Sequence, residues 1–228
     1  MTALNRSTME FLNRVVAITE SERPIAQALK TAFEGEGAKV EMIPSEQSAA
    51  EFSRAHPQID TLILLFPAFP VGPTLALDET VWEPLVNRSL LRAIQLIKAI
   101  GAGMVARRRG VIITIGGLAG SNGWPGWAVA SAVQGAMLGL TRSLAVEWAQ
   151  SNVRVLYLAT TPAEGEAASA NGAGPTSAEL IARTPLQRVA RADELANVAR
   201  YLASDRASFT TGTPVRADGG WSSWGLLK

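Results

Sequence analysis

One uninterrupted stretch, residues 110–148, most constrains what this chain can fold into. It begins with a short run of Val, Ile and Thr bounded by glycines, residues 110–115, which is typical of a buried strand in a parallel sheet. A glycine-rich loop follows, and residues 127–150 then contain no proline and few charges. Because this last segment is apolar nearly all round, it predicts a helix that is buried on several sides. Buried strand, loop and buried helix in this order predict an α/β protein with a parallel sheet.

The rest of the chain continues this pattern of apolar runs and amphipathic segments. A second long helix is predicted at residues 79–106, where apolar residues such as Leu90, Ile94 and Ile97 recur near the helical period. Asp78 is the expected N-cap of that helix. Further strands are predicted at residues 14–19, 40–43, 60–66, 153–158 and 214–217, and shorter helices at residues 49–55, 177–182 and 192–204.

Length and composition bound the classes of function. A chain of 228 residues with 47% hydrophobic residues suits one large domain, residues 1–228. A net charge of +1 offers no basic field for nucleic acid, and the absence of cysteine excludes disulfides and thiolate chemistry. The single histidine, His56, precedes a proline in a predicted loop, and no metal site is predicted. No apolar run reaches membrane-spanning length and no signal-peptide order opens the chain, so we expect a cytoplasmic protein without a membrane partner.

Two sequence motifs resemble the short-chain dehydrogenase/reductase family. GLTRSLAVEWAQSNVRV, residues 139–155, resembles the central helix of that family and the strand after it. The C-terminal part agrees, with PLQR at residues 185–188, ADELA at residues 192–196 and YLASDRASFTTGTPVRADGG at residues 201–220. The resemblance covers the chain from about Val15 to Gly220 and implies a Rossmann-like, doubly wound parallel sheet with helices on both faces.

The resemblance also indicates where this chain departs from the family fold. Only residues 45–59 separate the second and third predicted strands, whereas a helix-plus-strand crossover takes roughly 30 residues. We therefore expect about six strands, one strand–helix unit fewer than the family norm. Residues 163–176 are rich in Gly, Ala and Ser and replace the substrate-binding lid, so they are expected to be mobile. Residues 1–12 form an N-terminal segment and residues 221–228 a C-terminal tail.

The positions that carry the family's chemistry are occupied by other residue types. By resemblance, the catalytic Tyr falls on Ala130, the Lys on Gln134 and the Ser on Gly117. The Asn of the proton relay falls near Ser89, with Asn87 as the alternative register. Alanine has no exchangeable proton and glutamine no charge, so the prediction is that the chain has no catalytic residue at these positions.

The cofactor-binding loop departs from the family in the same way. The glycines that let a backbone approach a dinucleotide pyrophosphate correspond here to Glu20, Pro24 and Ala26. Glu20 and Glu22 place two carboxylates where phosphates would lie, which repels them. Large apolar side chains in residues 64–67 stand where the family has Asn-Asn-Ala-Gly. The prediction is therefore that neither NAD(H) nor NADP(H) binds and that the chain uses no cofactor.

The leading hypothesis for function is a non-catalytic subunit that supports an active NAD-dependent paralogue of the same family. Such a complex would oxidise an alcohol or a hydroxyacyl-CoA compound, and assembly with a second copy of this chain is the other option. The two long predicted helices would form the contact, because their apolar surfaces exceed what one sheet can cover. The predicted interface residues are Val129, Val133, Ala136, Met137, Leu140, Ile94, Ile97, Trp221 and Trp224.

Two alternatives remain open from the sequence. The first is a small-molecule sensor or binding protein that uses the cleft of the fold. The second is a nucleotide-independent enzyme with relocated residues. The tail residues Trp221 and Trp224 are expected to dock either on the chain itself or on a neighbouring subunit.

Overall fold

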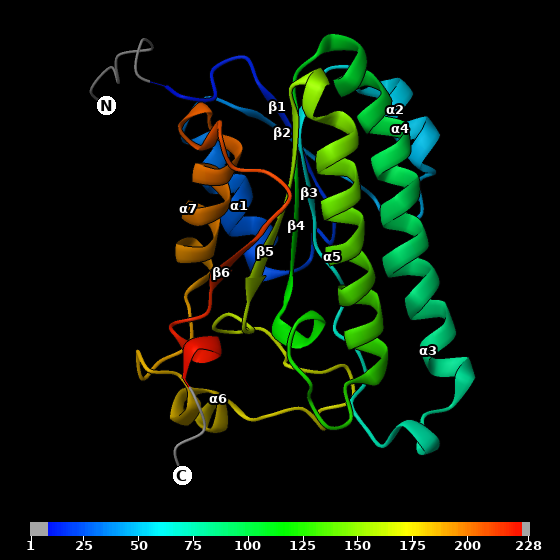
Figure 1. The fold of residues 1–228 in the computed structure, drawn as a ribbon, viewed down its shortest axis with the longest axis vertical. Coiled ribbons are helices and arrows are strands. Elements are labelled where there is room, and N and C mark those ends of the chain that lie inside the picture. The colour runs from blue at the N-terminus through cyan, green and yellow to red at the C-terminus, as the bar shows by residue number, and fades with distance from the viewer. Residues whose placement is uncertain (1–8, 225–228) are drawn as a thin grey trace.

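The computed structural model describes residues 9–224 and shows one sheet covered by helices on both faces (Figure 1). All strand pairs are parallel, and the strand order is β2-β1-β3-β4-β5-β6. The strands are β1 (Val15–Ile18), β2 (Lys39–Met42), β3 (Ile59–Leu64), β4 (Gly110–Gly117), β5 (Val153–Thr160) and β6 (Pro214–Ala217). This six-stranded, Rossmann-like doubly wound sheet confirms the predicted fold class.

The helices form one layer on each face of the sheet (Figure 1). One layer contains α1 (Pro24–Glu34) and α7 (Ala192–Ala203), and their apolar faces share a core with alternate residues of the strands. The other layer contains α2 (Ala49–Ala55), α4 (Arg92–Arg107) and α5 (Ala128–Trp148), which bury a second core. Two separate cores, one on each face, explain why the central strands are apolar on both sides.

The link between β2 and β3 contains only the short helix α2. Its start is fixed by a capping box, in which the Ser48 hydroxyl accepts from the Glu51 backbone and the Glu51 carboxylate accepts from the Ser48 backbone. The chain passes β1 on this crossover, because β1 lies between β2 and β3 in the sheet. The predicted loss of one strand–helix unit is confirmed.

The prediction of a single helix at residues 79–106 is wrong in one respect. The segment is divided into α3 (Glu79–Val86), a π-helical turn (Asn87–Leu91) and α4. Asp78 caps α3 as expected, since its carboxylate accepts from the Thr80 backbone at 2.8 Å. Pro84 lies inside α3 and removes a backbone donor there, and the π-helical turn follows three residues later.

Two helical segments, Glu79–Arg107 and Ala128–Ser151, are long and apolar enough to span a membrane by length and composition. The sequence had predicted no apolar run of membrane-spanning length. Both segments lie in the layer that packs on the sheet, as core helices of water-soluble α/β proteins do (Figure 1). Their composition is therefore no clear membrane signal, and a cytoplasmic location stays a prediction.

Candidate functional site

A cavity of about 390 Å³ opens beyond the carboxyl ends of β4 and β5. The loops after β1 and β3, the N-terminal half of α5 and the segment after β5 also line it. Open parallel sheets bind their ligands at this edge, and the volume lies in the range of small-molecule sites. We therefore take this cavity as the candidate site.

Gln134 is one of the buried polar residues of the cavity wall, as are Thr160 and Thr161. Gln134 lies on α5, is only 6% exposed, and its Oε1 has no hydrogen-bond partner within residues 9–224. Gly117, at the end of β4, lies against it, because a Cβ at Gly117 would stand 3.1 Å from both polar atoms of the Gln134 amide. A buried acceptor without a partner costs free energy, so this amide is suited to a ligand or a bound water.

The structure does not bring the four catalytic family positions together. Gln134 and Gly117 line the main cavity, whereas Ala130 is fully buried in the core beneath α5 and does not line it. Ser89 lies in the π-helical turn and lines a separate, smaller pocket. The alternative, Asn87, is exposed at the start of the same turn.

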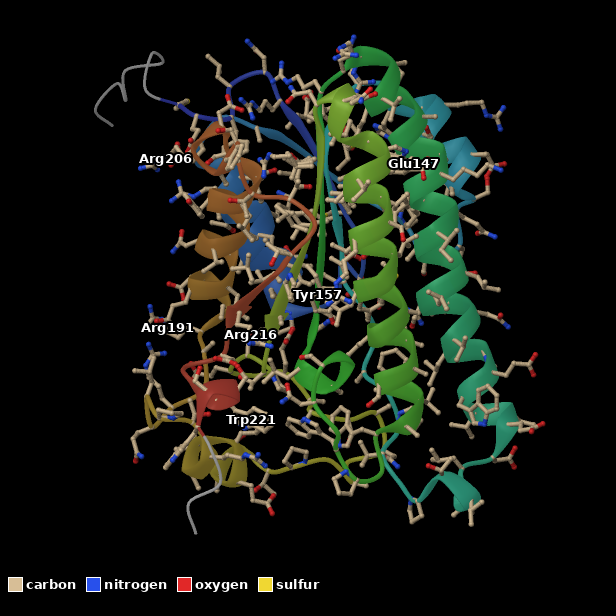
Figure 2. All side chains as sticks on the ribbon, in the orientation of Figure 1. Glu147, Tyr157, Arg191, Arg206, Arg216 and Trp221 are labelled. Atoms are coloured by element: carbon tan, nitrogen blue, oxygen red, sulfur yellow. The ribbon has the colours of Figure 1, made fainter. Side chains whose placement is uncertain are left out.

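Tyr157 does not replace the missing tyrosine. Its side chain is fully buried within β5, near the centre of the molecule (Figure 2), and its hydroxyl donates to the Gly117 carbonyl at 3.1 Å. Burial raises the pKa of this hydroxyl well above its ordinary value, so it stays neutral. The second tyrosine, Tyr201, is half exposed on α7, on the other face of the sheet. Tyr157 therefore has a packing role.

An ion pair crosses the cavity wall from the loop after β1 to the segment after β5. Arg23 donates from Nε and Nη2 to the two carboxylate oxygens of Glu166, at 3.1 and 2.7 Å, and from Nη1 to the Phe66 carbonyl at 2.7 Å. The Glu166 side chain is only 5% exposed and that of Arg23 is 30% exposed. This bidentate pair ties part of the 163–176 segment, predicted to be mobile, to the start of α1.

The loop after β1 has the shape of a helix start. Pro24 is the first residue of α1, Ala26 is fully buried in the core, and Glu20 has a positive φ of 53°. The Glu20 carboxylate accepts from Arg88 at 3.1 Å. Its side chain lines both the main cavity and the small pocket beside β2, so it stands between them.

The residues present do not fit a nicotinamide dinucleotide. In an open α/β sheet such a cofactor extends across the strand ends, here from the main cavity past Glu20 to the small pocket beside β2. That small pocket holds about 30 Å³, room for about two water molecules rather than an adenosine. Leu64 and Leu65 form part of its wall. The site and the cofactor therefore disagree in charge, because of the Glu20 carboxylate, and in volume, because of the small pocket.

Four side chains, which we call the aromatic stack, form one end of the cavity region: Trp124, Trp127, Trp221 and Arg183. Trp124 and Trp221 are stacked with ring centroids 4.8 Å apart, and Trp127 meets Trp124 edge-on at 5.4 Å. The Arg183 guanidinium, from α6 (Ser177–Arg183), lies 4.1 Å from the centroid of Trp221. Trp124 and Trp127 line the cavity, while Trp221 supports them from behind.

A tight turn after β6 positions Trp221. Asp218 accepts backbone hydrogen bonds from Gly220 and Ser222, both at 3.0 Å. Gly219 and Gly220 have positive φ angles of 61° and 87°, which favour glycine. Figure 2 shows Trp221 at the end of the molecule opposite Glu147. Trp221 therefore docks on its own chain, and its assignment to a subunit interface is corrected.

The other predicted interface residues fall into two groups. Val133, Met137 and Ile97 are buried in the core of the chain itself, so they have little surface left for a partner. Val129 and Leu140 are partly buried, and the exposed residues are Ala136, Ile94 and Trp224. Assembly through α4 and α5 stays a prediction, and residues 225–228 of the predicted tail lie outside the described part of the chain.

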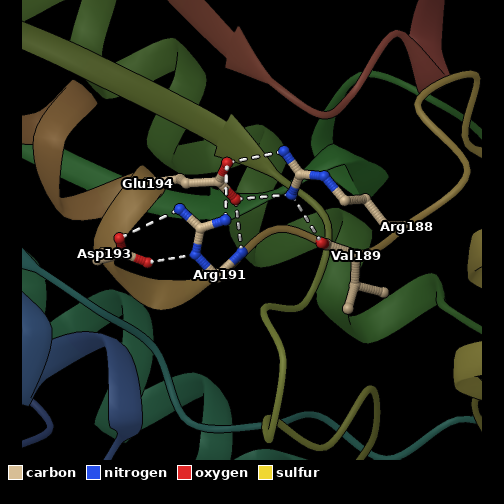
Figure 3. Close-up of polar contacts among 5 residues, drawn as sticks. All are labelled: Arg188, Val189, Arg191, Asp193 and Glu194. Atoms are coloured by element: carbon tan, nitrogen blue, oxygen red, sulfur yellow. Dashed lines mark hydrogen bonds and ion pairs between the residues drawn. The ribbon is translucent and has the colours of Figure 1, made fainter.

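A charged network at the start of α7 lies outside the cavity lining (Figure 3). Arg188 donates to both oxygens of Glu194, each at 2.7 Å, and the Arg191 backbone N–H donates to Glu194 at 2.9 Å. Arg191 also donates to Asp193 at 3.0 Å. Chiefly because of the hydrogen bonds from Arg188, the pKa of Glu194 falls to about 2. The network stabilises the N-terminus of α7.

Comparison with known proteins agrees with this fold. Residues 44–222 match the family model described as enoyl-(acyl carrier protein) reductase. The chain is 30% identical over 239 residues to dehydrogenase/reductase SDR family member 6 of Rattus norvegicus, covering 92% of this chain and 97% of the relative. The chain therefore belongs to the short-chain dehydrogenase/reductase family, a family of oxidoreductases.

Solved structures share the fold. One described as a short chain dehydrogenase/reductase family protein has a TM-score of 0.80 and 28% identity, covering 94% of this chain and all of that one. A gluconate 5-dehydrogenase from Burkholderia cenocepacia in complex with NADP and tartrate has a TM-score of 0.83, covering 96% and 99% of the two chains. Its identity is 24%, so this second similarity concerns the fold alone.

These comparisons contradict the hypothesis of a non-catalytic structural subunit. The relatives are named as dehydrogenases and reductases, and the gluconate 5-dehydrogenase is described with NADP bound. None of these descriptions names a non-catalytic subunit. The hypothesis was built on the residues missing from the family positions, which do not by themselves define a structural role.

Proposed function

We propose that this protein binds a small organic molecule with a hydroxyl or carbonyl group in its cavity, and that Gln134 is the polar anchor. The observation behind the proposal is the Gln134 amide, buried in the wall of a ligand-sized cavity with Oε1 unpartnered among the described residues. An amide can accept from a hydroxyl through Oε1 and donate to a carbonyl through Nε2. Many dehydrogenases, the class named for several of its relatives, interconvert hydroxyl and carbonyl groups.

The proposal separates ligand binding from the family's hydride-transfer chemistry. At the position of the family tyrosine the chain has Ala130, which is fully buried and has no proton to transfer. Gln134 at the lysine position has no charge with which to lower a neighbouring pKa. The wall at Glu20 and the small pocket beside β2 argue against a nucleotide. The chain is thus a family member that has kept the cavity and lost this chemistry.

Calorimetric titration of the purified protein tests the proposal. A panel of small uncharged alcohols and ketones should yield at least one compound that saturates the wild type. Gln134→Leu should weaken that compound about five- to tenfold, the value of one hydrogen bond. Gln95→Leu, an exposed position on α4, is the matched control and should leave the affinity unchanged.

The same protein should give no heat with NADP(H) or NAD(H) at millimolar concentration. A micromolar nucleotide affinity, or nucleotide-dependent turnover of any panel compound by the wild type, would refute the claim that the chain binds its ligand without hydride-transfer chemistry. A panel that binds equally well to wild type and Gln134→Leu would remove Gln134 as the anchor.

A further inference from the structure

Strand β2 is a free edge of the sheet. Its only strand partner among residues 9–224 is β1, and the link from β2 to β3 contributes no further strand. The backbone N–H groups of Lys39 and Ile43 donate to carbonyls of the β1 segment, at 2.9 and 2.8 Å. In a parallel ladder the N–H and C=O of successive residues point to opposite sides. The backbone groups of Val40 and Met42 therefore point away from β1.

These outward groups leave one side of β2 open. Neither Val40 nor Met42 makes a backbone hydrogen bond to a loop of the part of the chain that the structure describes. A row of exposed N–H and C=O groups is a template on which another strand can add. Which strand can add is decided by the side chains that it meets on the two faces of β2.

The two faces of β2 carry different side chains. Val40 and Met42 are partly buried against the core that contains α1. Lys39 and Glu41 lie on the opposite face, where the Lys39 ammonium is 2.6 Å from the Glu41 carboxylate. The Lys39 side chain is 72% exposed, and His56 Nδ1 lies 3.5 Å from the same carboxylate. The edge therefore presents apolar groups on one face and a cation and an anion, two positions apart, on the other.

An antiparallel copy of β2 fits this edge best in one register. When Val40 faces Val40 of a second copy, Lys39 faces Glu41 on both sides of the two-fold axis, and Met42 faces Ala38. Val40 then exchanges two backbone hydrogen bonds with its counterpart. Opposite charges directly across an antiparallel pair are stabilising, and like charges are destabilising. Slipping one copy by two residues in either direction sets Glu41 against Glu41 or Lys39 against Lys39.

Lys39 makes this edge selective. A lysine on an edge strand opposes pairing with most other strands, because its charge would lie beside the new strand without a counterion. A carboxylate directly opposite removes this penalty, and a second β2 provides one in Glu41. Pairing about a two-fold axis uses each edge once and stops at two copies.

We propose that two copies of this chain pair antiparallel through β2 and join their six-stranded sheets into one continuous sheet. The contact is centred on Val40 and has two Lys39–Glu41 ion pairs across the two-fold axis. It is independent of any ligand in the cavity and differs from the predicted contact through α4 and α5. Because β2 contributes only four residues per copy, we expect a reversible dimer that forms as the protein concentration rises.

Amide hydrogen exchange followed by NMR tests the pairing. It is measured at protein concentrations below and above the dimer midpoint, which analytical ultracentrifugation provides. The N–H groups of Val40 and Met42 should exchange at least about tenfold more slowly in the dimer, because they become hydrogen-bonded. The N–H of Glu41 points to β1 and is the internal control, so it should be protected equally at both concentrations.

Charge reversal tests the ion pairs. Lys39→Glu and Glu41→Lys each place like charges opposite one another at two symmetric positions, so each should weaken the dimer about tenfold. The double variant Lys39→Glu with Glu41→Lys restores opposite signs and should dimerise nearly as the wild type does. Arg216→Glu is the matched control, because Arg216 is an exposed cation on β6 at the other edge of the sheet, and it should leave the dimer unchanged.

Four outcomes would overturn the inference. The first is a wild type that stays monomeric up to about 1 mM. The second is a dimer that Ala136→Arg on α5 dissociates while Lys39→Glu leaves it intact, which would place the contact on the helices. The third is a double variant that dimerises no better than the single variants. The fourth is assembly beyond two copies through β2, which would indicate head-to-tail pairing.

Discussion

The carboxyl edge of the sheet has two ends that differ in how they are filled. The cavity end, beside α5 and the aromatic stack, encloses about 390 Å³. The filled end, beyond β1 and β2, retains about 30 Å³ beside Leu64, Leu65 and the Glu20–Arg88 ion pair. Both ends rest on the same parallel sheet with the same strand spacing. The fold therefore places potential sites at an edge, and the loop side chains decide which of them stays open.

The two ends also differ in the room beside their unpartnered polar atoms. At the filled end Glu20 pairs with Arg88, and the buried Ser89 Oγ has no partner among residues 9–224. At the cavity end Gln134 Oε1 and Trp124 Nε1 are buried and, among residues 9–224, have no partner. Only the cavity end, with about 390 Å³ against about 30 Å³, has room for an organic ligand beside its unpartnered atoms. This difference underlies the proposed function, and the following substitutions are designed to break it or sharpen it.

The largest effect is expected from removing the support of the cavity end. Trp221→Ala should lower the free energy of unfolding by about 3–5 kcal/mol, because it empties a fully packed aromatic position. Chemical denaturation monitored by circular dichroism measures the change. Trp224→Ala is the matched control: Trp224 is 48% exposed where Trp221 is 4% exposed, so its loss should stay within about 0.5 kcal/mol. Equal losses in the two variants would contradict intrachain docking of Trp221.

The Arg23–Glu166 ion pair closes the wall at the mouth of the cavity. Arg23→Met should cost about 2 kcal/mol of stability, since it leaves a 5%-exposed carboxylate without its partner. This expected loss of stability lies below the range for fully buried ion pairs, because the Arg23 side chain is itself 30% exposed. The double variant Arg23→Met with Glu166→Gln should recover most of the loss. A double variant as unstable as the sum of the two single variants would show that the two side chains act independently.

Much of the fold was predictable because local signals and tertiary structure agree. The apolar run at residues 110–115 forms the start of β4, and the capping box at Ser48 begins α2 at the predicted residue. The short β2–β3 link revealed the missing strand–helix unit through chain length alone. The helix at residues 79–106 was less predictable, since nothing in its periodicity marks the π-helical turn after Val86.

The candidate site was less predictable, because its key contacts join distant segments. Arg23 and Glu166 are 143 positions apart, and the sequence contains no spacing rule that pairs them. Trp221 stacks on Trp124, which lies almost 100 positions earlier in the chain, so a tail tryptophan was assigned to an interface instead. Gln134 was identified only as a substitute for a lysine. Its burial next to Gly117, which makes it a candidate anchor, became visible only in the structure.

A smaller effect, and of opposite sign, is expected at the anchor itself. Gln134→Leu removes a buried acceptor that has no partner in the described part of the chain, and leucine has a similar volume. The free protein should therefore gain about 1 kcal/mol of stability while losing affinity for its ligand. Thermal denaturation without ligand measures the gain, and Gln95→Leu should show none. A destabilised Gln134→Leu would indicate that the amide is already satisfied, for example by bound water.

The smallest effect is expected far from both ends, in the network at the start of α7. The pKa of Glu194 is lowered to about 2 in the folded chain, from an ordinary value near 4.5, so the folded state favours the ionised carboxylate. Its contribution to stability is therefore complete above about pH 4.5 and is lost as the pH falls to about 2. Because the network is largely solvent-exposed, Glu194→Gln should lower the free energy of unfolding by only about 0.5 kcal/mol at pH 7, and this loss should shrink steadily between pH 4.5 and pH 2.

The control is Glu83→Gln, exposed on α3, which should match the stability of the wild type over the same pH interval. Ligand binding at the cavity end should be the same in both variants at pH 7. A deficit for Glu194→Gln that is independent of pH would show that the side chain acts through packing of the α7 terminus rather than through its charge.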